Sequence, residues 1–127
     1  EDCVVAGTRG WFQDKSMQKT VGEVDYEKIV NREAQRLSMS LDAAERLRNN
    51  AGKPNLPILV FLHFPPVFGD FLSRETVDIL HAHQVTDCYF GHIHGVYEIP
   101  PAETFEGITF HLISADYLNF MPLLVRI

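Results

Sequence analysis

Residues 58–66 read ILVFLHFPP, and residues 87–95 read DCYFGHIHG. Each stretch contains a continuous apolar run, which is typical of a strand that is buried on both faces of a sheet. Between the two runs, Ser73 is placed to cap a helix that presents Val77 and Leu80 on one face. A strand, a helix and a second strand of these lengths predict a βαβ unit with parallel strands and a right-handed crossover.

Three histidines follow these strands at the points where they end. His63 comes directly after the strand expected at 58–62, and His92 and His94 follow the strand expected at 87–90. Because parallel strands end at the same edge of a sheet, the three imidazoles are expected to lie together. Imidazole is a common metal ligand near neutral pH, and two histidines at alternate positions of extended backbone point to the same side. The sequence therefore predicts a metal site at this edge.

The other segments predict an α/β domain around this unit. A short apolar strand is expected at 3–6, a loop at 12–22, and a helix with one apolar stripe at 25–50. Ser38 and Ser40 are the positions at which that helix could break in two. Further strands, forming an antiparallel part of the sheet, are expected at 96–99, 107–114 and 121–127.

The composition is that of an ordinary globular domain. The chain has 127 residues, of which 46% are hydrophobic and 22% charged, as expected for one domain with one core. Its formal net charge of -6 provides no basic surface for nonspecific binding to nucleic acid. No segment has the ~20 apolar residues of a membrane span, and no leader peptide is recognised. Cys3 and Cys88 are expected to be reduced, and the expected location is the cytoplasm.

The histidine motifs resemble the last two metal-binding motifs of calcineurin-like metallophosphoesterases. The matching residues are His63 with Pro65 and the string Gly91-His92-Ile93-His94, each after an apolar strand. Residues 7–11, GTRGW, are also similar to a loop of some bacterial members. The resemblance implies a β-sandwich flanked by helices, with a centre of two divalent metal ions, Mn, Fe or Zn, at its edge. It further implies that His63 and His92 ligate one metal ion and His94 the other.

Three further motifs of that family are absent from the 127 residues. No Asp is followed two positions later by His, no Asn is followed by His, and Gly69-Asp70 is followed by Ser73 where the family has a second Asp. The chain is therefore expected to be the C-terminal part of one metallophosphoesterase domain. The N-terminal metal-binding half, and the general acid with it, are expected outside this sequence. The full-length protein is expected to hydrolyse phosphate monoesters or diesters, and this part alone to be inactive.

Other polar residues are further candidates for the site, on less specific sequence signals. Arg9 is the best local candidate to bind a substrate phosphate, because its planar guanidinium matches phosphate oxygens, with an ordinary loop-anchoring role as the alternative. Asp116 is a weaker candidate for a residue that supports the metal ligands. His81 and His83 lie near a helix end and are expected to be solvated, whereas His111 is expected to be structural or at the surface.

A non-catalytic interpretation is the alternative. In it, the chain is a module that retains part of the fold, holds at most one metal ion through His63, His92 and His94, and assembles with a partner. Half of a sandwich exposes strand edges and apolar faces, so association with the missing half or with a second copy is expected. The expected substrate is a phosphorylated small molecule or another phosphoester, and neither a membrane nor nucleic acid is an expected partner.

Overall fold

The computed structural model of the protein describes residues 2–11 and 25–125. Within these ranges the chain forms one five-stranded sheet, a two-stranded hairpin and two helices, which confirms an α/β domain. The loop expected at 12–22 lies outside the described residues. No helix in the described ranges has the length and apolar character that crossing a membrane requires.

Four neighbouring strands of the sheet are parallel. In spatial order they are β1 (Val4–Thr8), β2 (Ile58–Leu62), β5 (Asp87–Phe90) and β7 (Ile108–Leu112). The edge strand β6 (Ala102–Phe105) runs antiparallel to β7. The strands expected at 3–6, 58–62 and 87–90 are thus present, and the parallel pairing of β2 with β5 confirms the βαβ unit.

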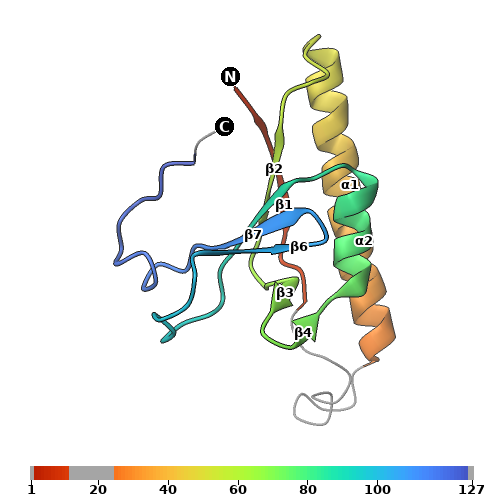
Figure 1. Cartoon of the computed structure of the whole chain (residues 1–127). Coiled ribbons are helices and arrows are strands. Elements are labelled where there is room, and N and C mark those ends of the chain that lie inside the picture. Colours follow the sequence, from red (N-terminus) through yellow and green to blue (C-terminus); the bar gives the residue numbers. More distant parts are fainter. Residues whose placement is uncertain (1, 12–24, 126–127) are drawn as a thin grey trace.

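Both helices lie on the same side of the sheet, as Figure 1 shows. They are α1 (Tyr26–Asn50) and α2 (Arg74–Ala82), and α2 follows the short hairpin of β3 (Val67–Phe68) and β4 (Phe71–Leu72). The expected cap at Ser73 is confirmed, because its side chain accepts a hydrogen bond from the Thr76 backbone N–H.

The suggested break of the long helix at Ser38 or Ser40 is wrong, because α1 is continuous. Ser40 does not compete for the backbone of its own helix. Its hydroxyl oxygen instead accepts a hydrogen bond from the Gly7 backbone N–H at 3.0 Å, and this bond ties α1 to β1. A serine with a partner outside its helix does not interrupt the helix.

The expectations for the C-terminal part need three corrections. The strand expected at 107–114 exists as β7, but it pairs in parallel with β5, and the antiparallel part is limited to β6 and β7. Residues 96–99 form no strand, because the chain turns at Gly95, where φ is +73°, and is then held by contacts described below. Residues 121–125 also form no strand, and 126–127 lie outside the described residues. The edge strand β6 was not anticipated.

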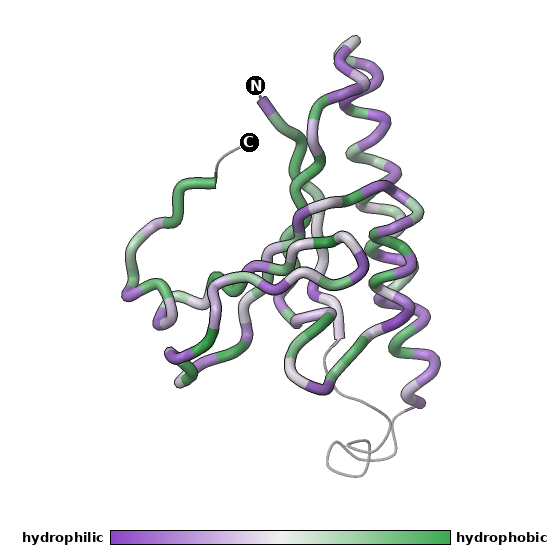
Figure 2. The backbone as a smooth tube through the Cα atoms, in the orientation of Figure 1, coloured by the Kyte–Doolittle hydropathy of each residue, from purple (hydrophilic) through white to green (hydrophobic). Residues whose placement is uncertain are grey.

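The hydrophobic core lies between the sheet and the two helices. Alternate residues of the parallel strands contribute to it together with residues of α1 and α2, and Figure 2 shows green, apolar stretches along these strands and helices. Leu41 of α1 and Val60 of β2 have no exposed surface, and Phe110 of β7 is 1% exposed. The core further contains Ala6, Leu37, Ala44, Ile58, Leu62, Val77, Leu80, Cys88, Phe90, Ile108 and Leu112.

The opposite face of the sheet, here called the helix-free face, carries a row of stacked rings. Phe61, Tyr89 and His111 stand opposite one another on β2, β5 and β7. The Phe61 and Tyr89 ring centroids are 4.9 Å apart, and those of Tyr89 and His111 are 4.5 Å apart. His111 also bonds to Asp87 at 2.9 Å, so its expected structural role is confirmed. Further along this face, Val5 of β1 is 62% exposed.

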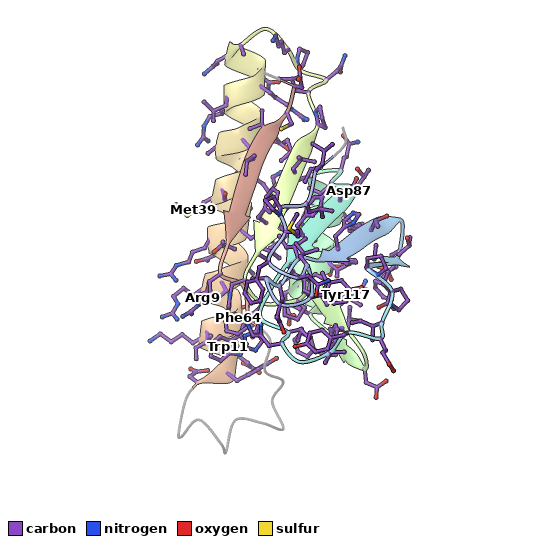
Figure 3. All side chains as sticks on the ribbon, turned by 90° about the vertical axis from the view of Figure 1, so that its left-hand side faces the viewer. Arg9, Trp11, Met39, Phe64, Asp87 and Tyr117 are labelled. Carbon is purple, nitrogen blue, oxygen red and sulfur yellow. The ribbon has the colours of Figure 1, made fainter. Side chains whose placement is uncertain are left out.

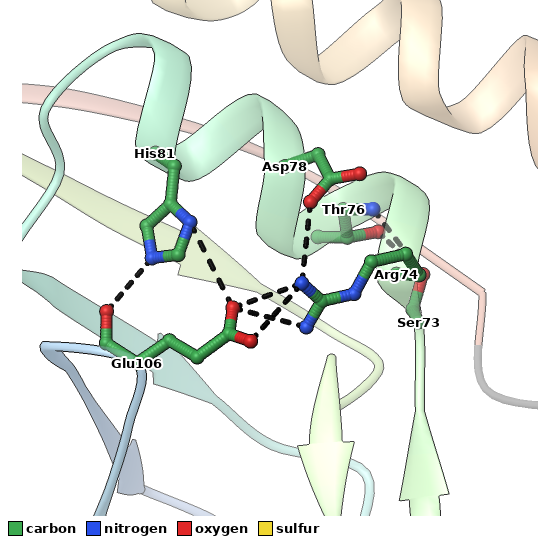
Figure 4. A network of polar contacts seen from close by, with 6 residues as sticks. All are labelled: Ser73, Arg74, Thr76, Asp78, His81 and Glu106. Atoms are coloured by element: carbon green, nitrogen blue, oxygen red, sulfur yellow. Dashed lines mark hydrogen bonds and ion pairs between the residues drawn. The ribbon is translucent and has the colours of Figure 1, made fainter.

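A surface network joins α2 to the turn between β6 and β7 (Figure 4). Arg74 forms a forked ion pair with Glu106 and also contacts Asp78. His81 lies 2.8 Å from the backbone oxygen of Glu106 through its Nε2 atom. The network therefore fixes the antiparallel end of the sheet against α2, and it explains why His81 is bonded although its side chain is 39% exposed.

Candidate metal centre at the carboxyl edge of the sheet

The candidate residues lie at one edge of the sheet, where the four parallel strands end. Arg9 follows β1, His63 follows β2, His92 and His94 follow β5, and Asp116 lies four residues beyond β7. Figure 3 shows Arg9, Trp11 and Phe64 together at this edge, with Asp87 at the opposite end of the strands. The parallel topology therefore explains how residues more than a hundred positions apart belong to one region.

His63 and His92 form a direct pair. The Nδ1 atom of His92 lies 3.2 Å from the Nε2 atom of His63, so one ring donates a hydrogen bond to the other. The Phe64 ring packs edge-on against both imidazoles, with centroid separations of 4.6 Å to each. The two imidazoles meet edge to face, with ring centroids 5.1 Å apart and an angle of 72° between their planes, and Phe64 packs against both.

A tight backbone turn at His92 ends the strand. His92 has a φ of +66°, and the Ile93 N–H donates to the Gly91 carbonyl oxygen at 2.8 Å, which closes a three-residue turn around His92. A side chain other than glycine is strained in this region of φ. The Gly91 N–H is anchored to the His63 carbonyl oxygen at 3.2 Å. The strained turn therefore sits at the place where the His92 ring meets His63.

The surroundings of His92 favour its neutral form. Partial burial lowers the pKa of His92 below its ordinary value, and the neighbouring His63 and His94 lower it further because like charges repel. Only the neutral imidazole offers a lone pair to a metal ion. The electrostatics of this edge therefore keep His92 in the form that can ligate a metal.

His94 pairs with Asp116 instead of with the other two histidines. Its Nδ1 atom lies 2.7 Å from Oδ1 of Asp116, while its side chain is 65% exposed. The second carboxylate oxygen of Asp116 accepts the Gly95 N–H at 2.9 Å and the Tyr97 hydroxyl at 3.2 Å. The Gly95 N–H and then the His94 contact lower the pKa of Asp116 to about 2. The same carboxylate raises the pKa of Tyr97.

The three predicted ligands thus meet at one edge, but as two separate pairs. Among the described residues, Asp42, Glu45 and His83 are the one group of three metal-binding side chains whose ligand atoms all lie within 4.8 Å of one another. His63, His92 and His94 do not reach that mutual distance in this arrangement. The structure therefore brings His63 to His92 and places His94 beside them with a partner of its own.

The group of Asp42, Glu45 and His83 lies between the two helices. His83 Nδ1 is 2.8 Å from Glu45 and its Nε2 is 3.8 Å from Asp42. The expectation that His83 is solvated is wrong, since its side chain is only 13% exposed. The contact joins the C-terminal end of α2 to α1 across 38 residues of sequence, so a local pattern could not reveal it.

Arg9 lies in a cluster of positive charge beside the histidine pair. Its guanidinium is 3.0 Å from Oε1 of the buried Glu33, which Arg36 approaches to 2.9 Å and Arg32 to 3.6 Å. Arg9 also lies over the Trp11 ring, which in turn packs against Phe64. Three cations share one carboxylate, and the guanidinium side chains are about half exposed. This location has surplus positive charge in a chain whose net charge is -6.

An apolar cavity of about 480 Å³ adjoins the histidine loop, here defined as residues 92–99. Phe90, two residues before His92, and Ile99, at the end of the loop, both line it. The hydroxyl of Tyr117 donates to the Ile99 carbonyl oxygen at 2.7 Å and so fixes this end of the loop. Phe64, Tyr97 and Tyr117 were not anticipated from sequence as parts of the site, because no local motif marks contacts of this range.

Comparison of the chain with models of protein families, with curated proteins and with solved structures yields no match.

Proposed function

We propose that the chain is the C-terminal part of a metal-dependent phosphoesterase of the calcineurin-like kind. In this proposal His63 and His92 ligate one divalent cation, His94 ligates a second, and the substrate is a phosphate monoester or diester. The proposal includes the finer fold assignment, in which the five-stranded sheet is one layer of a β-sandwich. The observation that carries it is the pairing of His63 with His92 at the carboxyl edge of parallel strands.

The separation of the two facing ring nitrogens fits a shared metal ion. His92 Nδ1 and His63 Nε2 are 3.2 Å apart. Two imidazole nitrogens, each about 2.05 Å from a tetrahedrally coordinated ion such as zinc, lie about 3.3 Å from each other. A change of tautomer in the donor ring, in which its proton leaves the facing nitrogen for solvent and the other ring nitrogen takes one up, together with a small widening, would therefore convert the pair into two ligands. The Phe64 ring, in contact with both imidazoles, limits the conformational entropy that binding removes.

In this proposal the remaining ligands come from polypeptide outside the 127 residues. Asp116 already accepts hydrogen bonds from His94, Gly95 and Tyr97, so it does not fit the role of a bridging carboxylate. The helix-free face, with Val5 62% exposed, is the surface on which we place the second sheet of the sandwich. The missing half of the domain is accordingly the proposed partner.

The protein residues have distinct tasks in the proposed reaction. A pair of bound divalent cations lowers the pKa of a water molecule and stabilises the charge of an in-line phosphoryl displacement. Arg9, with Arg32 and Arg36 nearby, supplies the surplus positive charge that attracts and orients a phosphoester. Phe64 keeps the rings of His63 and His92 in place.

Metal binding by the 127-residue chain is the first test. Zn²⁺ affinity is measured by competition with a chromophoric chelator for the parent chain, for His63→Ala and for His92→Ala. Removal of a direct ligand is expected to weaken binding by at least about 100-fold, because loss of an indirect support already costs about 10–100-fold. His81→Ala is the matched control, since His81 contacts the Glu106 backbone away from this edge. Equal affinity in all four proteins would contradict the proposed site.

Activity is tested on the polypeptide encoded by the whole reading frame, with Mn²⁺ present. Hydrolysis of an aryl phosphate and of a bis-aryl phosphate separates monoesterase from diesterase action. His92→Ala is expected to abolish both activities, and Arg9→Ala is expected to raise KM more than it lowers kcat. A full reading frame without turnover of either ester would favour the alternative, in which the chain is a non-catalytic metal-binding or assembly module.

A further inference from the structure

Asp116 and Tyr117 hold the histidine loop at two points. Asp116 accepts hydrogen bonds from the Gly95 N–H and the Tyr97 hydroxyl, and Tyr117 donates to the Ile99 carbonyl oxygen. The Asp116 side chain is only 21% exposed, whereas that of the neighbouring His94 is 65% exposed. A partly buried carboxylate therefore anchors a loop whose functional side chain stays open to solvent.

In the hydrogen bond between His94 and Asp116, the imidazole is the donor and the carboxylate is the acceptor. An ionised carboxylate can only accept hydrogen bonds, and three donors converge on Asp116: the ring of His94, the amide of Gly95 and the hydroxyl of Tyr97. At 2.7 Å the ring nitrogen Nδ1 must carry the proton of the bond. In a neutral imidazole the other nitrogen, Nε2, then holds the lone pair.

We infer that Asp116 is the positioning residue for His94. It fixes the Nδ1-protonated tautomer and the orientation of the ring, so that Nε2 is presented as the metal ligand. This inference rests on the proposed function for its consequence, but the tautomer itself is a property of the metal-free chain. A hydrogen bond from the ring N–H to a carboxylate also makes the opposite nitrogen a stronger donor to a metal ion.

The chain contains a matched control. His111 and Asp87 form a second histidine–aspartate pair, at 2.9 Å, on the helix-free face. Asp87 lies at the opposite end of the strands from Phe64 and the histidine edge (Figure 3). Replacing Asp87 by Asn therefore removes a comparable carboxylate without touching the proposed site.

The first experiment records the tautomer of His94 in the metal-free chain at pH 8, by two-bond ¹H–¹⁵N correlation spectra of the histidine rings. The parent chain is expected to show Nδ1 protonated, and Asp116→Ala is expected to shift His94 toward the Nε2-protonated form. Asp87→Asn leaves His94 unchanged. If Asp116→Ala does not fold, Asp116→Asn replaces it, with Tyr97→Phe as the variant that removes a loop contact but keeps the pair with His94. An unchanged His94 tautomer in the Asp116 variants overturns the inference.

The second experiment measures Zn²⁺ affinity and stoichiometry in the same proteins. Asp116→Ala and Asp116→Asn are expected to weaken Zn²⁺ binding by roughly 10–100-fold, while Asp87→Asn keeps the parent affinity. If neither the parent chain nor the polypeptide of the whole reading frame binds Zn²⁺ but the His94 tautomer depends on Asp116, the proposed function fails and the positioning role stands. If Zn²⁺ binds equally well to the parent chain and to the Asp116 variants but less tightly to His92→Ala, the positioning role fails and the proposed metal site stands.

Discussion

The two faces of the five-stranded sheet are made from alternate residues of the same strands, yet they differ in what covers them. On the side of α1 and α2, Val60 and Leu41 are fully buried in a continuous core. On the helix-free face, Val5 is 62% exposed, while Phe61, Tyr89 and His111 stack in a row. Aromatic stacking along the sheet therefore replaces part of the cover that helices supply on the other side.

This difference bears on the proposed β-sandwich. The helix-covered face satisfies the requirement that a sheet bury an apolar face against another layer. The helix-free face still presents an exposed branched apolar residue on β1, as a sandwich layer does before its second sheet is packed on it. The comparison is thus a test of the proposed β-sandwich, and each prediction below bears on it.

The largest expected effect is on the helix-covered face. Leu41→Ala is expected to lower the free energy of unfolding by about 3 kcal/mol, because it leaves a cavity in a fully buried core. Val5→Ala on the opposite face is expected to cost less than about 0.5 kcal/mol, since the side chain is 62% exposed. Urea unfolding followed by circular dichroism measures both. Equal losses would show that Val5 is covered in solution, by a partner or by a second copy.

An intermediate effect is expected for the row of rings on the helix-free face. His111→Ala removes the stack on Tyr89 and the bond to Asp87, and is expected to lower the free energy of unfolding by about 1–2 kcal/mol. His81→Ala, at the surface of α2, is the control and is expected to cost about 0.5 kcal/mol. If His111→Ala lowers the free energy of unfolding no more than His81→Ala does, the row of rings does not stabilise the folded chain.

Alkaline pH is expected to lower the free energy of unfolding through Tyr89, which lies on the helix-free face. Burial raises the pKa of Tyr89 above its ordinary value of 10.0, and the nearby Asp87 raises it further. Between the unfolded pKa and the higher folded pKa the folded chain binds more protons, so stability is retained below pH 10 and falls as the pH rises above it. Unfolding midpoints from pH 9 to pH 11 measure the loss, and Tyr89→Phe is expected to reduce it. The same slope in both proteins would contradict the assignment.

The smallest expected effect is a difference in thiol reactivity between the two cysteines. Cys88 lies on the helix-covered face. Both are free, as expected from sequence. Burial, and then the charge of Asp87, raise the pKa of the Cys88 thiol, which is fully buried, whereas Cys3 is partly exposed. A thiol reagent in native buffer is expected to label Cys3 and to reach Cys88 only in urea. Cys3→Ser then leaves no reactive thiol, and labelling of Cys88 in that variant without urea would show that the core opens readily.

Local patterns were sufficient for most of the elements and for where the candidate ligands occur along the chain. Apolar runs and helical spacing reflect burial on one or both faces, so they predicted β1, β2, β5 and both helices. The cap at Ser73 follows from a hydrogen bond made within three residues. The positions of His63, His92 and His94 after strands followed from the same patterns.

The tertiary structure alone decided which of these groups become partners. Whether His94 would meet His92 or Asp116, and whether His83 would be solvated or bonded to Glu45, depends on contacts across 22 and 38 residues. It likewise decided that β7 pairs in parallel with β5. Sequence spacing carries no signal for such contacts, because they arise when loops close and the layers pack together, and that closure is set by the whole chain.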